Sequence, residues 1–76
     1  MKMTEMEKGV FNAINLAIKY EDIYCVHVNG IVDYLGVVGN PHAADLTVNQ
    51  VKGVVGSLVK KRKIYEVEPN HFDTFK

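Results

Sequence analysis

The chain has 76 residues, of which 47% are apolar and 24% are charged, and this composition predicts one globular domain over residues 1–76 and excludes a disordered chain. A domain of this length buries only about 60% of its unfolded surface, which leaves little room for an enclosed active site. The single cysteine, Cys25, excludes an intramolecular disulfide, and no apolar run suggests a signal peptide or a membrane span, so we expect a cytoplasmic protein with no membrane partner.

Charge is unevenly distributed along the chain, although the net charge is zero. Residues 46–65 contain five basic side chains and no acidic one, which leaves four basic against nine acidic residues, a net charge of −5, in the rest of the chain. Such a separation creates a local field that can steer an anionic partner. The alternative is an ordinary basic helix end that is stabilised by the helix dipole.

The first predicted helix covers residues 5–19. Thr4 and Glu7 match a capping box, in which the Thr4 hydroxyl accepts from the N–H of Glu7 and the Glu7 carboxylate accepts from the N–H of Thr4. The apolar residues that follow lie on one stripe of a helix with 3.6 residues per turn: Met6, Val10, Ala13, Ile14, Ala17 and Ile18. This stripe is expected to face the core.

Shorter elements follow this helix. Residues 23–26 are a β-favouring run and predict a small strand. Apolar residues at helical spacing over 27–35 predict a short helix that stops at Gly36. Asn40 followed by Pro41 is typical of a helix N-cap and first turn, which predicts one additional helical turn at 42–44.

The last predicted helix covers about residues 47–62, and Thr47 and Gln50 form a second capping box at its start. Its buried face is expected to contain Val51, Val54, Val55 and Leu58. Its outward face is expected to contain Asn49, Gln50, Lys52, Gly53, Gly56, Ser57 and Lys60. Two alternating segments, 64–68 and 72–75, flank a turn at 69–71 and predict a C-terminal β-hairpin.

In this order of elements the chain resembles the winged helix-turn-helix domains, a family of DNA-binding transcription regulators. The resemblance is carried by IVDYLG at residues 31–36, as the helix before the turn, and by VKGVVGSLVKKRKI at 51–64, as the recognition helix and its exit. It implies an α+β, mainly α, fold of helix, short strand, helix, helix and a hairpin wing over 64–75. The chain departs from the family pattern in its long 36–45 connection, in Arg62 at a position where glycine is common, and in an acidic wing.

The resemblance also implies a DNA-binding site. The helix over 47–62 would lie in the major groove, where Asn49 and Gln50 can bond to adenine edges and Lys52 can reach guanine or phosphate. Basic residues at the helix exit can contact phosphates and supply affinity that does not depend on sequence. The candidate DNA-binding residues are Thr47, Asn49, Gln50, Lys52, Gly53, Lys60, Lys61, Arg62, Asn70 and His71.

Gly53 and Gly56 have two explanations. Each lowers helix stability by about 1 kcal/mol relative to alanine, so each is expected to have a compensating use. A glycine lets DNA approach the helix closely, or it lets the helix cross another helix tightly. Because both glycines flank the predicted apolar face, we favour packing.

Two functions of different classes remain open. The first is a small transcription regulator that binds double-stranded DNA, as a homodimer because one copy would make few phosphate contacts. The dimer contact would use the aromatic and apolar residues that the core pattern leaves unassigned, namely Phe11, Leu16, Phe72 and Phe75. The second is a protein-interaction module of the same fold that does not bind DNA, which the acidic wing and the zero net charge favour.

The sequence predicts no enzyme, no cofactor and no metal site. Cys25 and His27 lie on the same side of the predicted strand, but His42 and His71 are isolated in the sequence, so a third partner for a nucleophile or a metal is missing. We interpret Cys25 as a buried thiol and His27 as a helix cap.

Overall fold

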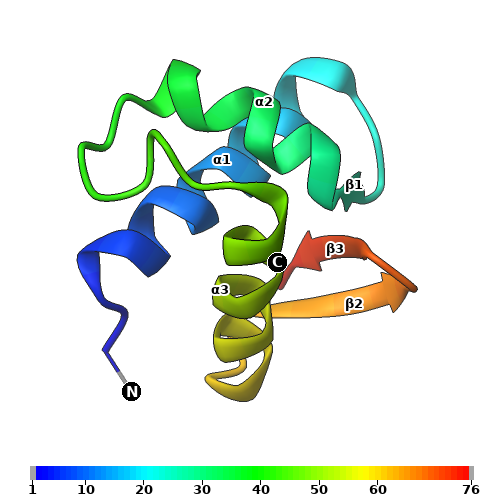
Figure 1. Cartoon of the computed structure of the whole chain (residues 1–76). Coiled ribbons are helices and arrows are strands. Elements are labelled where there is room, and N and C mark those ends of the chain that lie inside the picture. The colour runs from blue at the N-terminus through cyan, green and yellow to red at the C-terminus, as the bar shows by residue number, and fades with distance from the viewer. Residues whose placement is uncertain (1, 76) are drawn as a thin grey trace.

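The computed structural model describes residues 2–75 and is an α+β, mainly helical, domain. Three helices and a three-stranded antiparallel sheet are present in the described chain (Figure 1). Their bounds, in chain order, are α1 Glu5–Glu21, β1 Val26–His27, α2 Val28–Val38, α3 Val48–Lys60, β2 Ile64–Glu68 and β3 His71–Thr74. The predicted α+β, mainly helical, class and the predicted order of elements are therefore observed.

Both predicted capping boxes are confirmed. At α1 the Thr4 hydroxyl accepts from the N–H of Glu7 at 3.1 Å, and the Glu7 carboxylate accepts from the N–H of Thr4 at 2.7 Å. At α3 the same pair of bonds joins Thr47 and Gln50, at 3.2 and 2.9 Å. These bonds satisfy N–H groups that the first helical turn leaves without a partner.

The helix ends differ from the predictions. The expected stop at Gly36 is wrong, because α2 continues to Val38 and ends at Gly39, which has a φ of 69° and donates its N–H to the carbonyl of Leu35. Only the second glycine adopts the left-handed conformation that terminates a helix. Two non-glycine residues also take this conformation after helices, namely Asp22 after α1 and Arg62 after α3, with φ of 52° and 59°.

The core lies where the three helices meet the inner face of the sheet. Its buried residues are Val10, Ala13, Ile14, Ala17, Val26, Val28, Ile31, Leu35, Ala43, Val51, Val55, Leu58, Ile64 and Phe72. Phe72 is only 5% exposed, and Phe11 is half-buried against the same core. The expectation that Phe72 forms a dimer contact is therefore wrong, because the fold itself buries this side chain, whereas Phe11 is covered only in part.

The long connection between α2 and α3 packs on α1. The predicted turn after Asn40 is present, because the Asn40 side chain accepts from the N–H of His42 at 2.8 Å and its carbonyl accepts from Ala43 and Ala44. Ala43 is buried, and a Cβ added at Gly9 of α1 would lie 2.6 Å from the Cβ of Ala43. Glycine at position 9 therefore permits this close approach.

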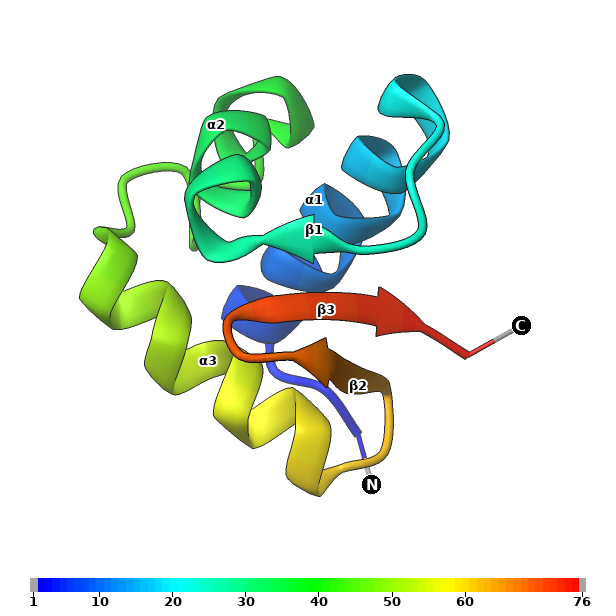
Figure 2. The same cartoon turned by 90° about the vertical axis from the view of Figure 1, so that its right-hand side faces the viewer.

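The sheet has the order β1-β3-β2, and β3 lies between the other two strands (Figure 2). The small strand forms at 26–27 and not at 23–26, because pairing with β3 places Val26 opposite Phe72 and His27 opposite His71. His27 also caps α2, since its Nδ1 accepts from the N–H of Asn29 at 3.1 Å. The hairpin of β2 and β3 is thus attached to the start of α2.

Candidate nucleic-acid interface

Helix α3 has one buried face and one open face. Val51, Val55 and Leu58 are buried and Val54 is half-buried, as predicted. On the opposite side, one exposed ridge is formed by residues at positions i, i+4, i+7 and i+11, namely Asn49, Gly53, Gly56 and Lys60. Figure 1 shows α3 standing between the N-terminal segment on one side and the β2–β3 hairpin on the other.

The two glycines of this ridge do not serve packing. In the described part of the chain, a Cβ added at Gly53 or Gly56 would have no atom of another element within 4 Å. The preference for helix–helix packing was therefore wrong. Each glycine still lowers helix stability by about 1 kcal/mol relative to alanine, so the ridge exposes bare helix backbone at a cost that no contact within residues 2–75 explains.

A groove of about 350 Å³ separates α3 from the hairpin. Lys52 and Lys60 stand on its α3 side, and Glu66 and Asn70 stand on its hairpin side. The remaining lining residues are Val55, Gly56, Val59 and Phe72. Two exposed ammonium groups next to bare backbone make the α3 side of the groove suitable for an anion.

The tip of the hairpin is acidic. The Glu66 carboxylate accepts from the N–H of Asn70 at 3.0 Å, and the Glu68 carboxylate lies 3.5 Å from Nδ1 of His71. Asn70 occupies the turn with a φ of 66°. His71 is half-buried in β3, and its ring lies 4.9 Å from the ring of His27. Of the two predicted wing contacts, Asn70 is therefore exposed at the turn, whereas His71 is held within the sheet.

The polar residues at the N-terminus of α3 differ in how many hydrogen-bonding groups they leave for a ligand. Asn49 is exposed. Gln50 is exposed as well, but its side-chain oxygen already accepts from the N–H of Thr47, so its two amide N–H groups and one lone pair of that oxygen remain for a ligand. The Thr47 hydroxyl accepts from the N–H of Gln50 and keeps its own proton for donation. Asn49 is thus the predicted base-contacting residue that the fold uses least.

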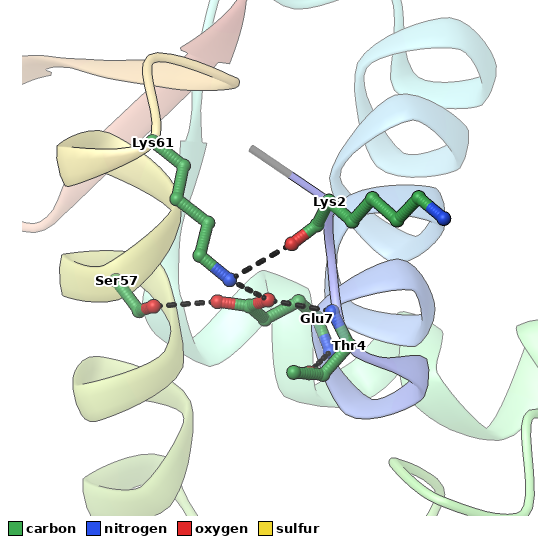
Figure 3. A network of polar contacts seen from close by, with 5 residues as sticks. All are labelled: Lys2, Thr4, Glu7, Ser57 and Lys61. Atoms are coloured by element: carbon green, nitrogen blue, oxygen red, sulfur yellow. Dashed lines mark hydrogen bonds and ion pairs between the residues drawn. The ribbon is translucent and has the colours of Figure 1, made fainter.

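The basic residues predicted at the exit of α3 differ in their exposure and contacts. Lys60 and Arg62 are exposed, and Lys63 is half-buried. Lys61 lies in a polar network with α1, in which its ammonium is 2.6 Å from Oε1 of Glu7 and 3.1 Å from the carbonyl of Lys2 (Figure 3). Lys61 is therefore engaged by the fold, unlike its neighbours.

Glu7 is the centre of this network and was not among the predicted site residues. Its side chain is 6% exposed, and the hydroxyl of Ser57 donates to its Oε2 at 2.5 Å. Hydrogen bonds from Lys61, Ser57 and Thr4 lower the pKa of Glu7 from 4.5 to about 2. The carboxylate therefore stays charged near neutral pH. The sequence identified Glu7 only as a cap, since its partners on α3 lie 50 and 54 residues away.

The remaining candidate chemistry is weak. Cys25 is half-buried, and burial raises the pKa of its thiol, which disfavours the nucleophilic thiolate. Among residues 2–75 there is no group of three or more His, Cys, Asp or Glu side chains placed to hold a metal ion. In the same part of the chain, none of the helices has the length and apolar character that crossing a bilayer needs.

Comparison with known proteins identifies no relative. No family model matches this sequence, and no curated protein or solved structure is matched by it. The geometry of the site is therefore the basis for a functional proposal.

Proposed function

We propose that the chain is a winged-helix transcription regulator that binds duplex DNA, with α3 in the major groove and the β2–β3 hairpin as the wing. The observation that carries this proposal is the exposed ridge of α3, on which Gly53 and Gly56 have no packing role and Lys60 is exposed. A surface that gives up helix stability for close access is expected to meet a partner there.

Each residue of the ridge, together with Gln50 and Lys52 near it on α3, then has a role. Asn49 and the amide group of Gln50, at the N-terminal turn, bond to base edges and supply specificity. Lys52 and Lys60, which border the groove between α3 and the hairpin, contact phosphates and supply affinity on any sequence. Gly53 and Gly56 let the backbone of α3 approach the floor of the DNA major groove closely.

A second candidate function is a protein-interaction module. Its support is the hairpin tip, where Glu66 and Glu68 would repel phosphates, and where Val67 is an exposed apolar residue beside them. In this case a protein partner would occupy the same ridge of α3. Both candidates require the ridge to be open, so the nature of the partner must be tested directly.

The test replaces each ridge glycine by alanine. Gly53→Ala and Gly56→Ala should each stabilise the fold by about 1 kcal/mol, because alanine favours the helix and the added methyl meets no other element. At the same time they should weaken binding to random duplex DNA, measured by fluorescence anisotropy at low and moderate salt. Gly36→Ala on α2 is the matched control, since Gly36 is also helical and open.

The outcomes separate the two functions. Stabilisation by all three variants, with loss of DNA binding only for Gly53→Ala and Gly56→Ala, supports DNA recognition by the ridge. Absence of DNA binding by the parent protein at micromolar concentration and low salt would reject it in favour of the protein-interaction module. Unchanged DNA binding by both ridge variants would show that DNA is bound elsewhere.

A further inference from the structure

We propose that the segment before α1 is a second DNA-backbone contact, and that Lys61 positions it. This inference rests on the proposed function and extends it to a different element of the chain. The ammonium of Lys61 bridges the Glu7 carboxylate and the main-chain carbonyl of Lys2.

The network fixes the N-terminal segment against the end of α3. Oε1 of Glu7 accepts both the N–H of Thr4 at 2.7 Å and the ammonium of Lys61 at 2.6 Å. Lys61 then donates to the carbonyl of Lys2 at 3.1 Å. Residues 2–4 are therefore held at the exit of α3 by a chain of charge-assisted hydrogen bonds, which are stronger than neutral ones.

Three cations are exposed on the segments that the network joins. The Glu7 carboxylate is compensated by Lys61, whereas Lys2, Lys60 and Arg62 are exposed. Figure 3 shows the side chain of Lys2 extending away from Glu7 and Lys61, so its ammonium is not used by the network. The surface thus offers cations from two elements that are remote in sequence.

A sugar-phosphate backbone fits this arrangement better than an isolated anion. The cations lie on two segments, Lys2 before α1 and Lys60 with Arg62 at the α3 exit, and each would meet a separate phosphate. With α3 in the major groove, its exit lies near the backbone that borders the groove. Lys2 would then contact phosphate directly, while Lys61 acts through the segment that it holds.

The experiment measures the salt dependence of binding to a random duplex by anisotropy. Lys2→Gln should reduce the slope of log affinity against log salt by about 0.9, the value for one lost phosphate contact. Lys19→Gln is the matched control, because Lys19 is exposed in the last turn of α1, and it should leave the slope unchanged. The Lys2 side chain is exposed, so neither variant should alter thermal unfolding.

The role of Lys61 is tested by coupling. In a Lys61→Met background, which removes the bridge, Lys2→Gln should change the slope by much less than 0.9. In a Lys61→Arg background, which keeps N–H donors, the full effect of Lys2→Gln should return. A purely structural role of Lys61 would lower stability without changing the effect of Lys2→Gln. Circular dichroism at the binding temperature confirms that each variant is folded.

The failures are distinguishable. A parent protein that does not bind DNA overturns the proposed function. A parent that binds DNA and loses affinity on Gly53→Ala, but keeps its salt slope on Lys2→Gln, overturns only the second contact. If Lys2→Gln reduces the salt slope equally in the parent, Lys61→Met and Lys61→Arg backgrounds, the Lys2 contact is supported and the positioning role of Lys61 is overturned.

Discussion

The ammonium of Lys61 lies 2.6 Å from Oε1 of Glu7, across 54 residues of sequence. The Lys61 side chain is 19% exposed and the Glu7 side chain 6%. Removing one partner of such a largely buried pair leaves the other charge uncompensated. In the intact pair, several hydrogen bonds offset the free-energy cost of taking the two charges out of water. This contact joins the first turn of α1 to the exit of α3.

Stability should fall with acidification because Glu7 becomes protonated. Its pKa is lowered from 4.5 to about 2 in the folded protein, so the unfolded chain takes up the proton first. The stabilisation is fully present above pH 4.5 and is lost as the pH falls from there towards about 2. Urea unfolding across this range should show the decrease.

Glu7→Gln is the control for this effect. The variant should be less stable than the parent near neutral pH, and its stability should depend less steeply on pH below 4.5, where the parent loses the contribution of the charged carboxylate. Parallel pH profiles for the two proteins would contradict the assignment of the acid sensitivity to Glu7.

Asn49→Ala and Gln50→Ala should lower sequence specificity more than affinity. In the proposed complex each variant loses a donor or acceptor for a base edge, and the expected cost is about 1–3 kcal/mol on a preferred site and little on random DNA. Competition binding with the two kinds of duplex measures the difference. Gln50→Ala also removes a cap bond, so its stability must be measured beside its binding. Equal losses of affinity for both duplexes would indicate that these residues contact the DNA backbone and not the bases.

Glu66→Gln should tighten DNA binding on every sequence. The carboxylate stands in the groove opposite Lys52 and Lys60, and glutamine can still accept the N–H of Asn70. Removing the repulsion between this exposed carboxylate and the DNA phosphates should make the binding free energy more favourable by about 0.5–1 kcal/mol at low salt and by less at high salt. Asp33→Asn on α2, also exposed, is the control and should have no effect. Weaker DNA binding by Glu66→Gln would argue for a direct role of the carboxylate.

Two backbone substitutions should have opposite effects on stability. Gly39→Ala should destabilise by about 1–2 kcal/mol, because its φ of 69° is unfavourable for any residue with a Cβ. Arg62→Gly should relieve a similar strain at a φ of 59°, offset in part by the larger entropy of glycine in the unfolded chain. Urea unfolding measures both. Arg62→Gly should also weaken DNA binding and reduce the salt slope by about 0.9.

Self-association should depend on the apolar residues that the fold leaves open. Phe75 is 60% exposed and Leu16 is half-buried. If the protein forms a dimer through them, Phe75→Ser and Leu16→Ser should each shift sedimentation towards a monomer at tens of micromolar protein. A parent that already sediments as a monomer at that concentration would rule out the dimer.

The sequence by itself determined the features that depend on near neighbours. Both capping boxes join residues three positions apart, so Thr4 with Glu7 and Thr47 with Gln50 could be identified from the sequence. The buried face of α3 followed from the helical period, and the strand period located the hairpin. The hairpin register did not follow, because His71 lies in β3 and not in the predicted turn, and the pairing shifts between Glu66 and Glu68. The end of α2 was missed, because two glycines compete within four residues and only the packing of the helix selects Gly39.

Only the tertiary structure decided which polar residues of α3 remain available to a partner. Lys60 and Lys61 are adjacent and chemically alike, yet Lys60 faces solvent while Lys61 faces the buried carboxylate of Glu7. Gly53 and Gly56 could have served packing or access, and the absence of any neighbouring element within 4 Å excludes packing within the described chain. The physical reason is that these outcomes depend on contacts between elements far apart in sequence, which no local period or motif specifies.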